Sequence, residues 1–201
     1  QYVGAEWTSM ASPSLFLSTR VAFSRSASAT LNRRTIADID SLSFVPGAPF
    51  GFLTVTGLTS SVGGDARVPR EDYLNNFQYT GSALWLRGRH SWKFGVSTQR
   101  QQFNTFNALQ QGGAVTFNNL ADFLRGTARS IDYSIPGFYD PVRGFRQSLV
   151  AGFAGDEFRL KPNLTITYGV RYEFASVPRE VNGKISNLRE VLDSTLAVGD
   201  P

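Results

Sequence analysis

The chain has 201 residues, of which 41% are hydrophobic, and a formal net charge of +4. No run of the sequence approaches the roughly 18 to 20 apolar residues of a membrane-spanning helix, and its start carries no signal-peptide pattern. The absence of cysteine excludes disulfide and thiolate-metal frameworks, and the scattered arginines give little support to a nucleic-acid partner.

The first predicted element is a β-hairpin. Residues 1–10 and 14–26 have the composition of strands, and Ala11–Pro13 makes a short turn between them. A long segment, 27–74, follows and is rich in Gly, Pro, Asn and Ser ("VPGAPFGF", "SSVGGDARVP"), which predicts a loop.

A second hairpin is predicted from strands at 75–87 and 91–104, with its turn at Arg87–His90. In the second of these strands Trp92, Phe94 and Val96 alternate with polar residues that include Lys93 and Gln99, so one face is apolar and the other polar. Leu84 and Leu86 interrupt the alternation in the first strand. The segment 105–144 is again a predicted loop, and "NNLADFLRG" within it has helical spacing with Gly126 as a stop signal.

The third hairpin joins 145–160 to 164–176 through Lys161–Asn163, and 177–201 is a predicted tail. Its second strand, "LTITYGVRYEF", alternates strictly. The apolar row holds Leu164, Ile166, Tyr168, Val170, Tyr172 and Phe174. Arg171 and Glu173 fall on the other face. In the first strand Asp156 falls in the apolar row, an irregularity that the pattern does not explain.

Two environments produce strands with one apolar and one polar face: a soluble sheet packed on a core, and a membrane barrel with lipid outside and water inside. Short turns that alternate with loops too long for a compact soluble domain favour the barrel. We therefore predict an all-β fold, an antiparallel meander of about six long strands with short turns at one end and long loops at the other, as a segment of a transmembrane β-barrel. The apolar rows are expected to face lipid. The residues expected to face the lumen are Lys93, Gln99, Arg171 and Glu173.

The segments "RGRHSWKFGV", "FNNLADFLRG", "PVRGFRQS", "DEFRLKPNLTITYGVRYEF" and "PREVNGKISNL" follow one another in the chain. Their order and spacing resemble the barrel region of TonB-dependent outer-membrane receptors, of the Oar-like type common in acidobacteria, which often carries a carboxypeptidase-regulatory-like domain. The likeness is clear over roughly residues 70–190. Where that family has an apolar-Gln-Asp-Asp-Trp run, this chain has "AGDEFRL", with Gly155 and Phe158 substituted.

The resemblance implies a location in the outer membrane of a Gram-negative bacterium and import of a bulky nutrient, such as an oligosaccharide, a peptide or a metal chelate. It also implies contact with outer-membrane lipid, and with a plug domain and the TonB system through parts absent from this chain. Six strands cannot close the roughly 22-stranded barrel of such transporters, so the chain is expected to be a piece of one. The alternative is a soluble β-rich binding module that recognises carbohydrate or protein through its loops.

No pattern for catalysis, a cofactor or a metal ion is present in the sequence, and we expect a protein that is not an enzyme. His90 is the only histidine, and its basic turn is a poor place for a carboxylate to orient it. Loop acids such as Asp38, Asp40 and Asp65 lack calcium-loop spacing. The substrate-contact candidates lie in one aromatic and basic stretch: Tyr133, Phe138, Tyr139, Arg143 and Arg146. Their rings and guanidinium groups suit a polar ligand, although the same residues would also serve to hold a loop together.

Overall fold

The structure, a computed structural model, describes residues 1–33, 36–58, 61–65, 67–135, 138–187, 190, 192 and 197–198. The chain divides into two units. Unit 1 comprises Gln1–Ser26, Tyr73–Asn104 and Gly144–Pro201, and unit 2 comprises Ala27–Asp72 and Thr105–Arg143. No helix among the described residues is long and apolar enough to cross a membrane.

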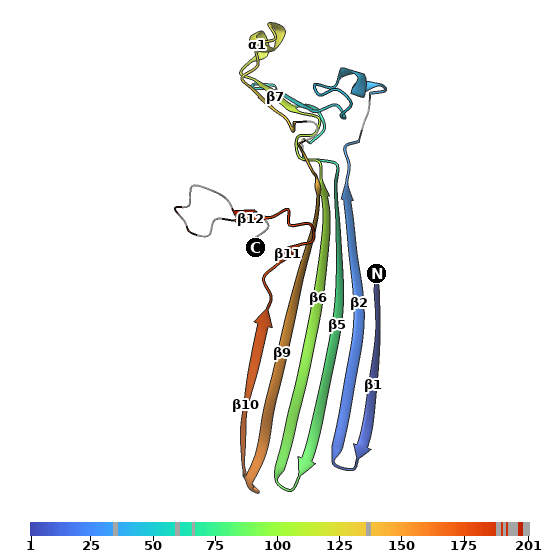
Figure 1. Cartoon of the computed structure of the whole chain (residues 1–201), viewed down its shortest axis with the longest axis vertical. Coiled ribbons are helices and arrows are strands. Elements are labelled where there is room, and N and C mark those ends of the chain that lie inside the picture. Colours follow the sequence, from blue (N-terminus) through green and yellow to red (C-terminus); the bar gives the residue numbers. More distant parts are fainter. Residues whose placement is uncertain are drawn as a thin grey trace. The chain divides into compact units, whose positions relative to one another are not determined.

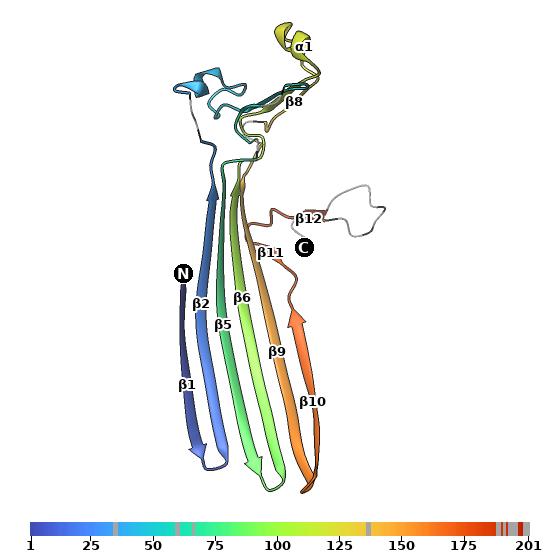
Figure 2. The same ribbon diagram turned by 180° about the vertical axis from the view of Figure 1, so that it is seen from behind.

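Six long strands make up most of the sheet in the described part of the chain: β1 (Tyr2–Ser12), β2 (Leu15–Thr30), β5 (Arg70–Arg87), β6 (His90–Asn107), β9 (Val142–Lys161) and β10 (Leu164–Ala175). They pair in the order β1-β2-β5-β6-β9-β10, and neighbouring strands run in opposite directions (Figure 1). The tight turns between β1 and β2, β5 and β6, and β9 and β10 lie at one end of the sheet (Figures 1 and 2). The predicted all-β antiparallel meander is therefore confirmed. The strands β2, β5, β6 and β9 extend beyond their predicted bounds on the side away from these turns.

Ring contacts define one face of this sheet, which we call the apolar face. Phe23 and Phe77 from neighbouring strands have ring centroids 4.9 Å apart, and Trp92 stacks on Phe94 at 6.2 Å. The alternation of side chains extends this face along each strand. Its members include Val3, Trp7, Val21, Phe23, Phe77, Trp92, Phe94, Val96, Ile166, Val170 and Phe174. Most of these large apolar side chains are exposed, as expected for a face that meets an apolar environment.

Polar contacts define the opposite side, the polar face. Ser18 donates to Glu6 at 3.3 Å across the first hairpin, and the Lys93 Nζ lies 4.0 Å from the Glu157 Oε2. In the third hairpin Arg171 is paired with Glu173 at 2.5 Å. These residues occupy alternate positions to the apolar rows, so the sheet is amphipathic along its whole width.

The segments predicted as irregular loops contain a second sheet, which corrects that expectation. Within the described residues of unit 2, four short strands pair in the order β4-β3-β7-β8: β3 (Phe52–Val55), β4 (Val62–Gly63), β7 (Ala114–Phe117) and β8 (Ser130–Asp132). A small core of Val55, Val115 and Phe117 packs against Leu53 and Ala128. Strands this short show too little alternation to be recognised, and β3 pairs in parallel with the distant β7.

The predicted helical element is present as α1 (Leu120–Leu124). The Asn119 side chain accepts a hydrogen bond from the Asp122 N–H at 2.9 Å and caps its first turn. Gly126 follows the helix with a φ of 71°, the conformation that glycine adopts most easily. The Phe123 ring meets Phe117 edge-on at 5.3 Å, which attaches the helix to the core of unit 2. A short 3-10 helix, η1 (Ile39–Leu42), lies elsewhere in this unit.

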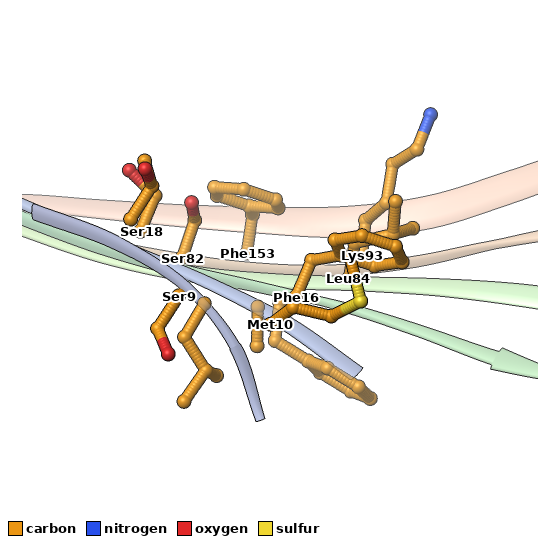
Figure 3. Close-up of a pocket in the computed structure, with 12 residues that line it drawn as sticks. Ser9, Met10, Phe16, Ser18, Ser82, Leu84, Lys93 and Phe153 are labelled. Carbon is orange, nitrogen blue, oxygen red and sulfur yellow. The ribbon is translucent and has the colours of Figure 1, made fainter. Parts of the chain in front are cut away.

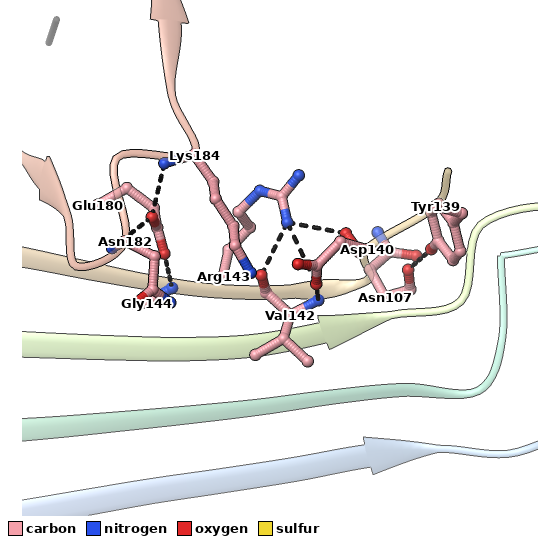
Figure 4. Close-up of polar contacts among 9 residues, drawn as sticks. All are labelled: Asn107, Tyr139, Asp140, Val142, Arg143, Gly144, Glu180, Asn182 and Lys184. Atoms are coloured by element: carbon pink, nitrogen blue, oxygen red, sulfur yellow. Dashed lines mark hydrogen bonds and ion pairs between the residues drawn. The ribbon is translucent and has the colours of Figure 1, made fainter. Parts of the chain in front are cut away.

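The predicted tail begins with a short strand held by a buried carboxylate. β11 (Arg179–Glu180) pairs with β9, and β12 (Ser186–Asn187) pairs with β13 (Ala197–Val198). Glu180 is 6% exposed, and its carboxylate accepts hydrogen bonds from the backbone N–H groups of Gly144, Asn182 and Lys184 at 2.8 to 2.9 Å (Figure 4). Burial acts to raise the pKa of Glu180, but these N–H groups outweigh it and hold the pKa below its usual range.

We expect Glu180→Gln in the full-length protein to expose the amides that the carboxylate binds. A buried donor left without an acceptor costs about 1–3 kcal/mol, so hydrogen-exchange protection of Gly144, Asn182 and Lys184 should fall roughly tenfold at neutral pH. Glu173→Gln, which removes an exposed carboxylate from β10, serves as the matched control and should leave these amides unchanged.

The same contact predicts a pH dependence. The folded pKa of Glu180 is lower than its ordinary value of 4.5, so its contribution to stability is complete above about 4.5 and is lost as the pH falls through the folded value. Protection in the wild-type protein should then converge on that of Glu180→Gln. A wild-type protection pattern that stays constant into strong acid would contradict the role of this carboxylate.

Candidate functional site

The four residues predicted to face a lumen all follow the alternation of the polar face. Lys93 and Arg171 carry the polar contacts described above, with Glu157 and Glu173 as their partners. Gln99 lies an even number of positions after Lys93 in β6 and therefore shares its face. Their lumenal orientation stays a prediction, because the sheet alone does not establish what each face contacts.

The polar face is not uniformly polar. A hollow of about 550 Å³ lies over β1, β2, β5, β6 and β9, and Figure 3 shows Ser18, Ser82, Lys93 and Phe153 on one side of the strands and Ser9 on the other. The Phe153 ring covers Gly95, where a Cβ would lie 2.2 Å from it. An aromatic ring therefore lies among the polar rows.

Further apolar side chains lie on the same side. Met10 is directly opposite Phe16 in the first hairpin, two positions from the Thr8–Ser18 pair, so both residues share the polar face with Ser18. Leu84 is two positions from Ser82 and shares it too. We call Met10, Phe16, Leu84 and Phe153 the inner apolar patch. The patch explains why Leu84 interrupts the alternation of its strand.

The substrate-contact candidates are divided between the two units. Arg146 belongs to unit 1, where its guanidinium donates to the Asn104 side chain at 2.9 Å. Tyr139 and Arg143 belong to unit 2, as do Tyr133 and Phe138.

Tyr139 and Arg143 are engaged in contacts within their own loop (Figure 4). The Tyr139 hydroxyl donates to the Asn107 carbonyl, and partial burial raises the pKa of this phenol. Arg143 donates to the backbone carbonyls of Asp140 and Val142 at 2.7 Å. These contacts match the structural alternative for both residues, whose contact with a ligand stays a prediction.

Tyr133 and Phe138 retain surface available for a ligand. The Phe138 residue is 90% exposed and Tyr133 is 53% exposed. An exposed aromatic ring offers a flat apolar surface without losing a contact of its own, so Phe138 is the stronger of the two candidates.

Unit 2 also contains a cavity that the sequence did not predict. Its volume is about 510 Å³, within the range of pockets for small organic ligands. Several glycines line it because backbone segments approach closely there: a Cβ on Gly51 would lie 2.0 Å from the Gly113 carbonyl oxygen. Phe50, Ile36 and Ile39 supply apolar surface to the same cavity.

Arg33 and Asp65 are the charged residues that line this cavity among those described. Asp65 is paired with the Arg67 guanidinium, whose hydrogen bonds hold the pKa of that carboxyl below its usual range. The Arg33 guanidinium has no hydrogen bond or ion pair within the described part of the chain. The cavity therefore presents one unpaired positive charge among its described residues, which suits a ligand that carries an anionic group.

One expectation about His90 was wrong. Although the residue adjoins a basic turn, its Nδ1 lies 2.5 Å from the Oδ2 of Asp156 in β9. Asp156 is 66 positions away in sequence, so the pairing depends on the order of strands in the sheet. Among the described residues, no serine hydroxyl bonds to His90.

The described residues include no group of three or more His, Cys, Asp or Glu side chains placed to hold a metal ion. No curated protein and no solved structure shows significant similarity to the chain. A protein-family profile described as an outer membrane beta barrel domain matches residues 1–200, almost the whole sequence. The amphipathic antiparallel sheet agrees with that match, and the chain belongs to the outer membrane beta barrel domain family.

Proposed function

We propose that the chain is part of a TonB-dependent receptor that imports a bulky nutrient across the outer membrane. The observation that carries the proposal is the amphipathic meander itself, in a family located in the outer membrane. The order of the five receptor-like segments from "RGRHSWKFGV" to "PREVNGKISNL" supports the receptor type. Outer-membrane membership argues against the soluble binding module, and no residue of the chain is assigned covalent chemistry.

The inner apolar patch supports a folded domain inside the barrel. Apolar side chains on the polar face cannot be covered by lipid, since lipid contacts the opposite face. If only water filled the barrel, the inner apolar patch would stay exposed. Each Å² of apolar surface left in water costs about 25 cal/mol. A plug domain supplied by another part of the protein would cover them.

We place the ligand site in unit 2. In barrels of this class the short turns face the periplasm and the long connections face the exterior. The connections from β2 to β5 and from β6 to β9 leave their strands at the ends opposite the tight turns, so these two connections would face the exterior. The cavity of unit 2, the Arg33 guanidinium and the exposed Phe138 ring would contact the ligand before transport. An oligosaccharide with acidic groups, a peptide and a metal chelate all meet these requirements.

Energy-dependent uptake tests the function directly. The parent bacterium and a strain lacking the full-length receptor would be grown on oligosaccharides, peptides or metal chelates as the limiting nutrient. We expect the mutant to lose growth on one class, and uptake of that class to stop when a protonophore collapses the proton gradient. Uptake that continues without the gradient would identify a passive pore instead.

The orientation of the two faces gives a second prediction. In the full-length receptor reconstituted in lipid, Arg171→Cys should react with a membrane-impermeant thiol reagent and Val170→Cys should be protected. A charge on the lipid side near the bilayer centre costs roughly 2–4 kcal/mol, so Arg171 belongs in the lumen. Detergent denaturation should make both positions reactive, which controls for reagent access. Ready labelling of Val170→Cys with protection of Arg171→Cys would reverse the assignment.

The cavity gives a third prediction. Arg33→Gln removes the positive charge of Arg33 from the cavity and should weaken uptake of an anionic nutrient roughly tenfold, because a hydrogen bond to a charged group contributes about 1.5–3 kcal/mol. Arg125→Gln removes the same charge from an exposed position in unit 2 outside the cavity and should have no effect. Surface expression of both variants would be measured alongside uptake. Equal uptake by the two variants would exclude the cavity as the anion site.

A further inference from the structure

A carboxylate lies buried on the apolar face, where burial without hydrogen bonds would be costly. Asp156 is 2% exposed. Its Oδ2 contacts His90 at 2.5 Å and accepts a hydrogen bond from the Tyr168 hydroxyl at 2.9 Å, while its Oδ1 accepts one from the Ser91 N–H at 3.1 Å. Three strands, β6, β9 and β10, thus converge on this carboxylate. It satisfies its hydrogen bonds within the sheet and contributes no free charge to the surface.

The consequence is a fixed and partly exposed imidazole. The His90 ring stacks on Phe158 at 4.4 Å and on Trp92 at 5.6 Å. The Asp156 carboxylate accepts from the Nδ1–H of His90, so Nε2 is the ring nitrogen left for a partner outside the protein. Nε2 donates to an anion in the imidazolium form, in which both ring nitrogens carry a proton. The His90 side chain is 37% exposed whereas that of Asp156 is fully covered, so the accessible part of the pair belongs to the imidazole.

Two guanidinium groups lie at the same end of the sheet. Arg89 donates to the backbone carbonyl of Leu160 at 3.3 Å, two positions beyond Phe158 in β9, and most of its donors stay available. Arg87 lies 5.3 Å from the centre of the Trp85 ring. Arginine and tryptophan together are typical of the level at which hydrocarbon meets lipid headgroups.

We propose that Arg89 and the Nε2 of His90 bind the phosphate of a phospholipid on the outer wall of the barrel, with Asp156 as the positioning residue. The tight turns of such barrels face the periplasm, so the site lies at the headgroup level of the periplasmic leaflet. The apolar face continues directly from the site along Trp92, Phe94 and Val96. A phospholipid fits both parts, since its phosphate meets the donors and its acyl chains lie along the apolar rows. Free phosphate would meet the donors alone.

The test uses the full-length protein in detergent and native mass spectrometry. Phosphatidylglycerol, diacylglycerol with the same acyl chains, and inorganic phosphate would be titrated separately. We expect phosphatidylglycerol to bind at least tenfold more tightly than either of the others. Equal binding of diacylglycerol would show that the site binds acyl chains without recognising the phosphate. Equal binding of inorganic phosphate would show that it binds an anion without recognising the lipid. Either result overturns the proposal.

Substitutions at the proposed site test where phosphatidylglycerol binds. Arg89→Gln and His90→Gln should each weaken phosphatidylglycerol binding roughly tenfold, as expected for loss of a hydrogen bond to a charged group. Arg159→Gln removes an exposed arginine from the adjacent position to Phe158, on the polar face, and should leave lipid binding unchanged. If Arg159→Gln weakens binding as much as Arg89→Gln, the attraction is general electrostatics and the proposed site is wrong.

Asp156→Asn tests positioning. The variant should weaken phosphatidylglycerol binding while diacylglycerol binding stays the same, because the imidazole loses its carboxylate partner although the apolar surface remains. Asp156→Glu, which retains the carboxylate, should restore part of the affinity. Unchanged phosphatidylglycerol binding in Asp156→Asn would remove Asp156 from the site. Should Asp156→Asn fail to insert, the variants at the exposed residues Arg89 and His90 decide the proposal.

Discussion

Backbone pairing is the constraint on which the rest of this structure depends. In hydrocarbon, an unpaired N–H or C=O group costs several kcal/mol, so a strand that crosses a membrane must bond to a neighbour on each side. Pairing fixes the extended conformation, and the extended conformation sends successive side chains to opposite faces. The alternation of Ile166, Val170 and Phe174 with Arg171 and Glu173 follows from that geometry once lipid lies on one face and water on the other.

The same constraint explains what the sequence predicts well. Alternation and tight turns are local, so the meander, the face of each strand and the helix before Gly126 can be predicted from neighbouring residues. The pairing of His90 with Asp156 is different, because it depends on strand order and on register between segments 66 positions apart. The β3–β7 pairing escapes prediction for a similar reason: each strand has four residues, too few to establish a period.

Composition is a weaker guide to ligand-contact residues than to strands, for a physical reason. Composition identifies residues that suit ligand contact, such as Tyr139 and Arg143, but it does not show whether their donors are already engaged. In the structure both bond to nearby backbone carbonyls. The unit 2 cavity arises instead from close approach of backbone at Gly51 and Gly113, and glycine spacing carries no signature of a cavity. Whether a side chain is exposed, and whether its charge is already paired, depends on the folded structure of the loop.

Leu84 and Asp156 depart from the alternation near the tight turns, and strand length accounts for this. β5 and β6 have 18 residues each, whereas a tilted strand needs roughly 9 to 11 to cross the hydrocarbon. The surplus ends are expected to lie outside the hydrocarbon, where an apolar residue can be covered by protein and a carboxylate can accept hydrogen bonds from its neighbours. Leu84 belongs to the inner apolar patch, and Asp156 is bonded by His90. A residue that breaks the alternation near a strand end of such a barrel therefore indicates a binding partner better than the residues that follow the alternation.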